Sequence, residues 1–165
     1  MSNSVSIQPV GNHVSRWGEG PRFWNNVLFY VDIEGHALIR LGLDPIHEDV
    51  WDVGERIGTV APTRDGSLLC AGDSGIFSFC LQGAEKKLLV DPESHKRPDN
   101  RFNDGLCDPS GRFWAGTIST TKQTGDASLY MLDHEGCLHK KIDHVTNSNG
   151  ICWNATASLM YYIDT

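Results

Sequence analysis

Arg101, Asn103 and Asp104 bring together, within four residues, side chains that bind polyhydroxylated or anionic small molecules. Arg101 offers a planar fork of donors that stays charged at any accessible pH, Asn103 offers one acceptor and two donors, and Asp104 adds a carboxylate. A turn over residues 109–111 and an apolar strand over residues 112–117 follow. We therefore expect a ligand-binding loop that leads into a strand. The alternative is an exposed polar loop that makes only its own turn hydrogen bonds.

Glu19 and Asn149 are two further candidates, and both are oxygen donors. Glu19 stands between two glycines and before Pro21, where the backbone can bring a side chain close to a ligand, and Asn149 precedes Gly150. Carboxylate and carboxamide oxygens favour Ca²⁺, Mg²⁺ or Mn²⁺ over metals that prefer thiolates. Each residue also has a plainer interpretation, because Glu19 could be a solvated turn carboxylate and Asn-Gly is a frequent hairpin turn. Only an architecture that carries both segments to one axis would make them a metal site.

Other chemistries find little support in the residues. The sequence contains neither a Gly-x-Ser-x-Gly elbow nor an HExxH pair, which argues against a serine hydrolase and a zinc protease of those types. The five cysteines stand far apart without a CxxC pair, so we expect reduced, mostly buried thiols instead of a zinc site or a disulfide framework. Trp114 and Trp153 adjoin apolar segments, and we expect them to pack in the core.

The composition favours a small-molecule partner. The chain has 165 residues, enough for one domain or a piece of a larger one, and a formal net charge of −7. Its Lys and Arg residues are scattered and do not form the positive surface that nucleic acid requires. No apolar run approaches the ~20 residues that span a bilayer, and the N-terminus lacks an export signal. We therefore expect a cytoplasmic protein that binds neither nucleic acid nor membrane.

Four segments of similar pattern recur along the chain, each an apolar or aromatic strand that ends on a small or acidic residue. They span residues 27–32, 67–72, 112–117 and 159–164. The equivalent positions Leu28, Leu68, Phe113 and Met160 are 40, 45 and 47 residues apart. Second short strands are expected over residues 36–41, 75–80 and 128–132, and no segment shows a long helical period. This periodicity is typical of a repeat architecture.

Many short strands, glycine-rich turns and a period near forty residues predict an all-β fold of the β-propeller type, in which each blade must stack on its neighbours to bury its faces. The segments account for about three blades plus the start of a fourth. A Greek-key sandwich is the alternative. We assign residues 1–14 to an N-terminal extension and residues 15–165 to a partial propeller domain that is truncated at its C-terminus. The unpaired edge of the last sheet would favour self-association.

Three ordered motifs resemble those of the senescence marker protein, gluconolactonase and luciferin-regenerating enzyme family. They are Gly-Glu-Gly-Pro at 18–21 with residues 29–33, Arg-Phe-Asn-Asp-Gly at 101–105 leading to Ala-Gly-Thr at 115–117, and Asn-Ser-Asn-Gly-Ile at 147–151 with residues 161–164. Each motif is weak alone, but the set keeps the family's order and spacing. The resemblance covers nearly the whole chain from about Arg16 onward.

The resemblance implies a six-bladed propeller that holds one divalent cation (Ca²⁺, Zn²⁺, Mg²⁺ or Mn²⁺) in its central channel and hydrolyses sugar lactones. Glu19 and Asn149 match the family's glutamate and asparagine metal ligands, and Arg101 and Asn103 match the residues that position the substrate. The family's third ligand, an aspartate usually assigned the proton-transfer role, falls beyond Thr165. The segment after Ala-Gly-Thr lacks a glutamate expected in some members, which leaves the preference for aldonolactones open.

Two functions follow from these observations. The first is a divalent-metal-dependent hydrolase of sugar lactones, gluconolactonase-like and represented by an incomplete chain, whose partner is a small-molecule lactone or sugar acid. The second is a non-catalytic propeller scaffold that binds a metal, a sugar acid or a protein partner, since one fold serves many functions. Neither function yet has an assigned catalytic residue in this chain.

Overall fold

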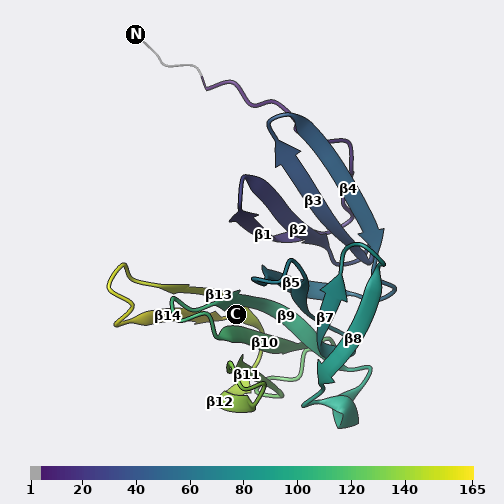
Figure 1. The fold of residues 1–165 in the computed structure, drawn as a ribbon. Coiled ribbons are helices and arrows are strands. Elements are labelled where there is room, and N and C mark those ends of the chain that lie inside the picture. Colours follow the sequence, from purple (N-terminus) through teal and green to yellow (C-terminus); the bar gives the residue numbers. More distant parts are fainter. Residues whose placement is uncertain (1–4) are drawn as a thin grey trace.

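Antiparallel β-strands make up most of the structure (Figure 1). The computed structural model describes residues 5–165. The strands are β1 (Gly18–Trp24), β2 (Val27–Asp32), β3 (Ala37–Leu43), β4 (Ile46–Asp52), β5 (Ile57–Pro62), β6 (Leu68–Gly72), β7 (Gly75–Cys80), β8 (Glu85–Val90), β9 (Asn100–Cys107), β10 (Phe113–Ser119), β11 (Ala127–Leu132), β12 (Leu138–Val145), β13 (Ser148–Trp153) and β14 (Met160–Asp164). A short 3-10 helix, η1 (Ser94–Lys96), precedes β9. Within the described residues, no helix has the length and apolarity that crossing a bilayer requires.

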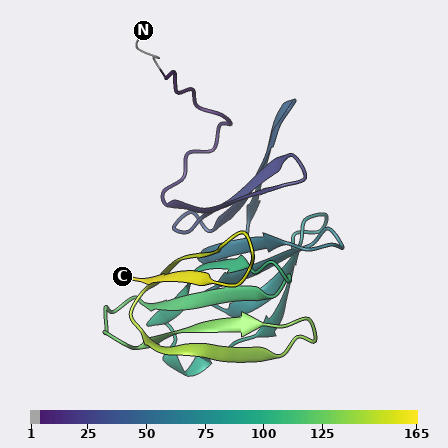
Figure 2. The ribbon, with the colours of Figure 1, turned by 90° about the vertical axis from the view of Figure 1, so that its left-hand side faces the viewer.

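The strands form four sheets in which neighbours in the chain are also neighbours in the sheet. Three sheets have four strands each, β1 to β4, β5 to β8 and β9 to β12, and the fourth consists of β13 and β14. The first strands of successive sheets lie side by side, β1 near β5, β5 near β9 and β9 near β13 (Figures 1 and 2). We call these four the inner strands. The structure is therefore a β-propeller of three complete blades and the first two strands of a fourth, and the sandwich alternative is wrong.

The apolar core lies between blades. One cluster joins the first two blades, and it contains Phe29, Val31, Ile33, Leu38, Val53, Ile57, Val60, Leu68, Cys70, Phe77 and Phe79. A second cluster joins the second and third blades, and it contains Ala61, Ala71, Ile76, Phe102, Phe113, Ala115, Tyr130 and Leu132. Because each sheet contributes side chains to the clusters on its faces, no blade can bury its apolar residues without its neighbours.

In three of the blades, an aspartate accepts hydrogen bonds from the backbone just before the inner strand. Asp32 at the end of β2 accepts hydrogen bonds from the two backbone N–H groups that lead into β1, at 2.9 and 3.0 Å. Asp164 at the end of β14 does the same for the two N–H groups before β13, at 2.8 and 2.9 Å. Asp73, which follows β6, accepts the N–H of Arg56 just before β5 at 3.1 Å. The recurring acidic residue thus fixes the point where β1, β5 and β13 begin.

The predicted turns are present, but the prediction of mostly buried cysteines is wrong. The turn at residues 64–66 is closed by the backbone bond from Thr63 N–H to the Ser67 carbonyl at 3.0 Å.

All five thiols are free, yet only Cys70 is buried and Cys107 is half-buried. The exposed ones are Cys80, Cys137 and Cys152. They lie at a strand end, beside a hairpin turn and on the open fourth sheet, where no neighbouring blade among the described residues covers them.

Trp114 and Trp153 join the third and fourth blades, as the sequence predicted. Trp114 is on β10 and Trp153 is on β13. Their rings meet edge to face with centroids 6.1 Å apart. The Trp114 indole also donates to the buried carboxylate of Asp108 at 3.0 Å. These two tryptophans therefore belong to the packing between blades.

Candidate functional site

A cavity of about 120 Å³ lies where the first halves of the inner strands meet. It is lined by Trp17, Glu19, Gly58, Arg101, Asn103, Asp104, Ile118, Asn147 and Asn149. Glu19, Arg101, Asn103 and Asn149, which come from three different blades, therefore share one cavity. Their assignment as metal ligands and substrate-binding residues remains a prediction.

Each of the four inner strands carries one extra residue at this cavity, so that the register with the second strand of its blade shifts. On β1 the shift falls between Glu19 and Arg22, and on β5 it falls at Gly58. On β9 the extra residue is Asn103, and on β13 it is Gly150. Such β-bulges bend a strand and redirect its side chains. Here the inner strand of every blade has its bulge beside the cavity.

The bulges correct three local interpretations. Residues 101–105 are not a loop, because they form the first part of strand β9. The Asn149–Gly150 pair is not a hairpin turn, because it lies inside β13 at the bulge, where Gly150 has a φ of +62°. Glu19 lies in β1 and not in a free turn. Glycine, proline and polar residues normally indicate a turn, but here they mark bulges in strands.

A hydrogen-bond chain connects β9 with β13 at the cavity. Arg101 donates through Nη1 to Asn103 Oδ1 at 3.1 Å and to the Phe102 carbonyl at 2.8 Å. Asn103 in turn donates through Nδ2 to Asn147 Oδ1 at 3.0 Å and to the Ser148 carbonyl at 2.9 Å. These contacts fix the orientation of the Asn103 amide, because its oxygen faces a guanidinium and its nitrogen faces two acceptors.

Arg101 is a buried cation with unused donors. Its residue surface is 5% exposed, and its Nε is buried without a hydrogen-bond partner in the structure. Burial lowers the pKa of the Arg101 guanidinium, and the nearby Arg56 adds to this effect, while Asp73, Glu34 and Glu19 oppose it. A buried donor without a partner costs folding free energy.

Glu19 and Asn149 are exposed within the cavity. The indole N–H of Trp17 donates to Glu19 Oε1 at 3.3 Å, so Trp17 forms a wall of the cavity and holds the carboxylate. Trp17 is itself held by its backbone N–H to Asp32. Sequence reasoning did not identify Trp17, Gly58, Ile118 or Asn147 as site residues. The only signal in the sequence that could have identified Trp17 as a site residue is its position two residues before Glu19.

Asp104 contacts Arg22 and the backbone of β13. Its carboxylate lies 3.5 Å from Arg22 Nη2 on β1. It also accepts the backbone N–H of Gly150 on β13 at 2.8 Å. Asp104 therefore connects strands that lie on both sides of β9.

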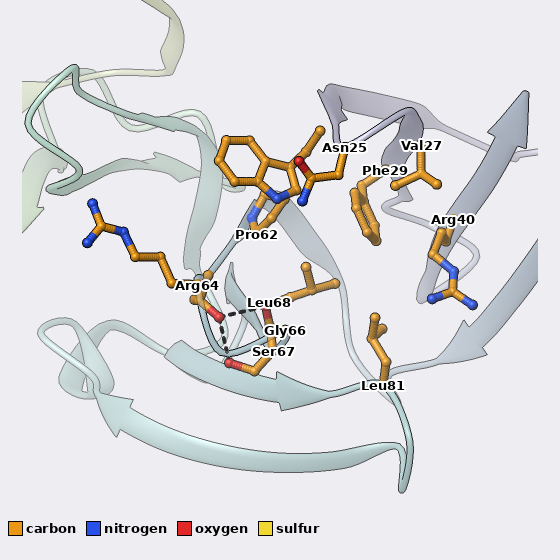
Figure 3. A pocket seen from close by; sticks show the side chains of 12 residues that line it. Asn25, Val27, Phe29, Arg40, Pro62, Arg64, Gly66, Ser67, Leu68 and Leu81 are labelled. Carbon is orange, nitrogen blue, oxygen red and sulfur yellow. Dashed lines mark hydrogen bonds between the residues drawn. The ribbon is translucent and has the colours of Figure 1, made fainter.

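A larger cavity of about 390 Å³ lies between the first two blades, beside the β1–β2 and β5–β6 turns (Figure 3). It is at the opposite end of the sheets from the polar cavity, because the inner strands run from one end to the other. Its two arginines are not poised for a ligand. Arg40 is paired with Asp49 at 2.6 Å and covers the Trp51 ring, and Arg64 extends away from the other labelled side chains. We therefore place the candidate site at the polar cavity.

The donors at the polar cavity suit a hard cation. In the described part of the chain, no group of three or more His, Cys, Asp or Glu residues is arranged to hold a metal ion. The cavity instead combines the Glu19 carboxylate with the amides of Asn103, Asn147 and Asn149. Oxygen donors of this kind match Ca²⁺, Mg²⁺ or Mn²⁺.

Comparisons with known proteins identify relatives of this chain. A family model described as the SMP-30/Gluconolactonase/LRE-like region matches residues 17–165. YvrE of Bacillus subtilis (strain 168), which carries a provisional name as a sugar lactone lactonase, is 34% identical over 161 residues, or 90% of this chain and 51% of YvrE. Regucalcin of Danio rerio is 30% identical over 168 residues, or 99% of this chain and 56% of that protein.

A solved structure extends the comparison to three dimensions. Regucalcin from Agrobacterium tumefaciens str. C58, a calcium-binding protein, matches with a TM-score of 0.85 at 29% identity. The match covers 92% of this chain and 51% of that one. This chain thus spans about half the length of these relatives.

Proposed function

Because the chain belongs to the SMP-30/gluconolactonase/LRE-like family, we propose that it supplies part of a divalent-cation-dependent hydrolase of sugar lactones. In this proposal Glu19 and Asn149 bind the cation, and Arg101 and Asn103 bind the substrate. The observation that supports it most is that these four side chains, separated by up to 130 positions in the sequence, line one cavity. The provisional lactonase name of YvrE and the calcium binding of the Agrobacterium regucalcin point in the same direction.

The proposed roles follow from the chemistry of each side chain. When bound, the cation would polarise the lactone carbonyl. Arg101, which lines the cavity, would donate through its guanidinium to an oxygen of the ring or of the hydroxy-acid product. Asn103, whose amide is fixed by Arg101 and Asn147, would set the angle at which the substrate enters. Trp17 would exclude water from one side of the Glu19 carboxylate.

The proton acceptor for the attacking water is expected outside this chain, in the part of the relatives' length that it does not span. With two of three expected protein ligands, both the cation affinity and the turnover of this chain should be low. A turnover equal to that of a full-length relative would contradict this assignment of the site.

The test is metal-dependent hydrolysis of δ-gluconolactone, measured above the spontaneous rate by pH-stat in the presence of Ca²⁺, Mg²⁺, Mn²⁺ or Zn²⁺. We expect Glu19→Ala and Asn149→Ala to reduce the cation-dependent rate by at least about 100-fold, because loss of an outer partner of a metal ligand already costs about 10- to 100-fold. Glu135→Gln is the matched control, because Glu135 is an exposed carboxylate in the β11–β12 turn.

Two outcomes would count against the hydrolase. Turnover that does not depend on the cation, or that survives both substitutions at Glu19 and Asn149, would contradict it. Cation binding without turnover in a folded sample would instead favour the non-catalytic scaffold. The natural lactone is left open by either result, because δ-gluconolactone only represents its class.

We further propose that the chain self-associates through β14, which pairs only with β13 in the structure. An unpaired strand exposes N–H and C=O groups to a second chain, and a charge on the strand discourages such pairing. Tyr161 on β14 is 55% exposed. We expect sedimentation velocity to show concentration-dependent association that Tyr161→Lys reduces, whereas Tyr161→Phe leaves it unchanged. A monomer at all concentrations would contradict this proposal.

A further inference from the structure

We propose that Asp104, supported by Arg22, is a positioning residue that holds Asn149 toward the cavity. Asp104 lies on β9, Arg22 on β1 and Asn149 on β13, so the three residues come from three blades. The consequence for cation binding rests on the proposed function. The positional role itself can be measured independently.

The contacts of Asp104 account for both of its oxygens. Oδ2 accepts the backbone N–H of Gly150 at 2.8 Å. Oδ1 accepts the N–H of Gly105 at 2.7 Å and lies 3.5 Å from Arg22 Nη2. The Arg22 guanidinium also donates to the Gly105 carbonyl. Because both oxygens bind strand backbone or Arg22, we assign Asp104 to positioning and not to the chemical step.

The Gly150 N–H needs this acceptor because of the bulge on β13. Asn149 pairs with Ile163 and Ile151 pairs with Tyr162, which leaves Gly150 as the extra residue without a partner on β14. The φ of Gly150 is +62°, a conformation in which glycine is favoured. A buried or half-buried backbone N–H without an acceptor is costly, so the carboxylate stabilises the bulge. Gly150 directly follows Asn149, and its peptide plane therefore sets the direction of the Asn149 side chain.

Arg22 explains why the acceptor is a charged group. Its side chain is 20% exposed, and its Nε is buried without a partner in the structure. Burial lowers the pKa of the Arg22 guanidinium, while Asp104 and then Cys107 oppose this effect. The attraction between Arg22 and Asp104 crosses from β1 to β9, and the bond to Gly150 continues from β9 to β13. One carboxylate thus sets the relative positions of the strands that carry Glu19 and Asn149.

The experiment must separate positioning from folding, because Asp104→Ala alone would leave Arg22 buried without its counter-charge. We therefore compare Arg22→Met with the double variant Arg22→Met/Asp104→Leu, in which both members of the pair are apolar. Backbone amide exchange by NMR is the first readout. We expect Gly150 to stay protected in Arg22→Met and to exchange about tenfold faster in the double variant, as for the loss of one hydrogen bond. Amides of β6 and β7 report whether the fold is intact.

The second readout is the dissociation constant of Mn²⁺, measured by calorimetry. We expect the double variant to bind about tenfold more weakly than Arg22→Met, the usual range for an outer partner of a metal ligand. If Asp104 acts through Asn149, adding Asp104→Leu to Arg22→Met/Asn149→Ala should change the dissociation constant little.

Unchanged protection of Gly150 in a folded double variant would overturn the positioning role, whatever the cation data show. Undiminished loss of affinity in the Asn149→Ala background would also overturn it, since Asp104 would then act by another route. If the unsubstituted chain does not bind Mn²⁺, the proposed function loses its metal site, while the exchange of Gly150 still decides the role of Asp104.

Discussion

Replacing Gly58 by alanine is expected to destabilise the fold by about 3 kcal/mol, the upper range for adding a methyl group to a packed interior. Gly58 is the extra residue of the β5 bulge and lies against β9. A Cβ at this position would lie 2.6 Å from both the Cα and the carbonyl carbon of Asn103, and closer still to its carbonyl oxygen. Because backbone cannot move aside as a flexible side chain can, the two inner strands must separate.

The measurement is urea denaturation followed by far-UV circular dichroism. Gly42→Ala is the matched control, because Gly42 is also a strand glycine, but its Cβ would make ordinary contacts, with the nearest atoms being the Pro45 and His47 carbonyl oxygens at 3.5 and 3.6 Å. Alanine there should be neutral or stabilising by up to about 1 kcal/mol, since glycine weakens strand interiors. Equal effects of the two substitutions would show that β5 and β9 are not packed as closely as described.

Removal of the Glu93 carboxylate should have an effect of similar size. Glu93 lies between β8 and η1, is 6% exposed, and accepts three side-chain hydrogen bonds from the third blade. The donors are Tyr130 Oη at 2.9 Å, Asn100 Nδ2 at 2.9 Å and Thr117 Oγ1 at 3.2 Å. Alanine would leave buried donors without an acceptor, and we expect Glu93→Ala to cost about 3 kcal/mol.

Glu93→Gln separates the hydrogen bonds from the packing. Glutamine keeps one acceptor oxygen and nearly the same volume, so we expect a loss of about 1 kcal/mol, the usual value of one hydrogen bond. Both variants would be unfolded thermally and in urea beside Glu135→Ala, an exposed carboxylate whose removal should have little effect. If Glu93→Ala is as stable as the unsubstituted chain, the second and third blades are not joined through Glu93.

The blades were predictable because the strands other than the inner strands have apolar and aromatic patterns typical of β-strands. Apolar and aromatic residues over residues 27–32, 75–80 and 128–132 predicted strands that the structure places at β2, β7 and β11. Their spacing near forty residues then required stacking between neighbours. The acidic ends of the segments 27–32 and 159–164 were visible in the sequence, but the bonds that Asp32 and Asp164 accept from the backbone before the inner strand depend on contacts within the blade.

The inner strands could not be predicted as strands, because their residues resemble those of loops. Residues 101–105 and the Asn149–Gly150 pair are polar or glycine-rich, and their strand conformation depends on pairing with β10 and β14. The four bulges lie beside one cavity because four blades pack around it. No single segment of the sequence encodes this arrangement. The resemblance identified the cavity residues Glu19 and Asn149, while Trp17 and Gly58 required the structure.

A titration with Mn²⁺ followed by ¹H–¹⁵N NMR tests most directly whether Glu19 and Asn149 share one cation. The paramagnetic ion broadens resonances only near its binding site. We predict that the side-chain amides of Asn103 and Asn149 and the Trp17 indole N–H broaden first, because all three residues line the cavity. Glu19→Gln should abolish this broadening, and Glu135→Gln should not. Broadening that begins elsewhere, or that persists unchanged in Glu19→Gln, would contradict a shared cation site.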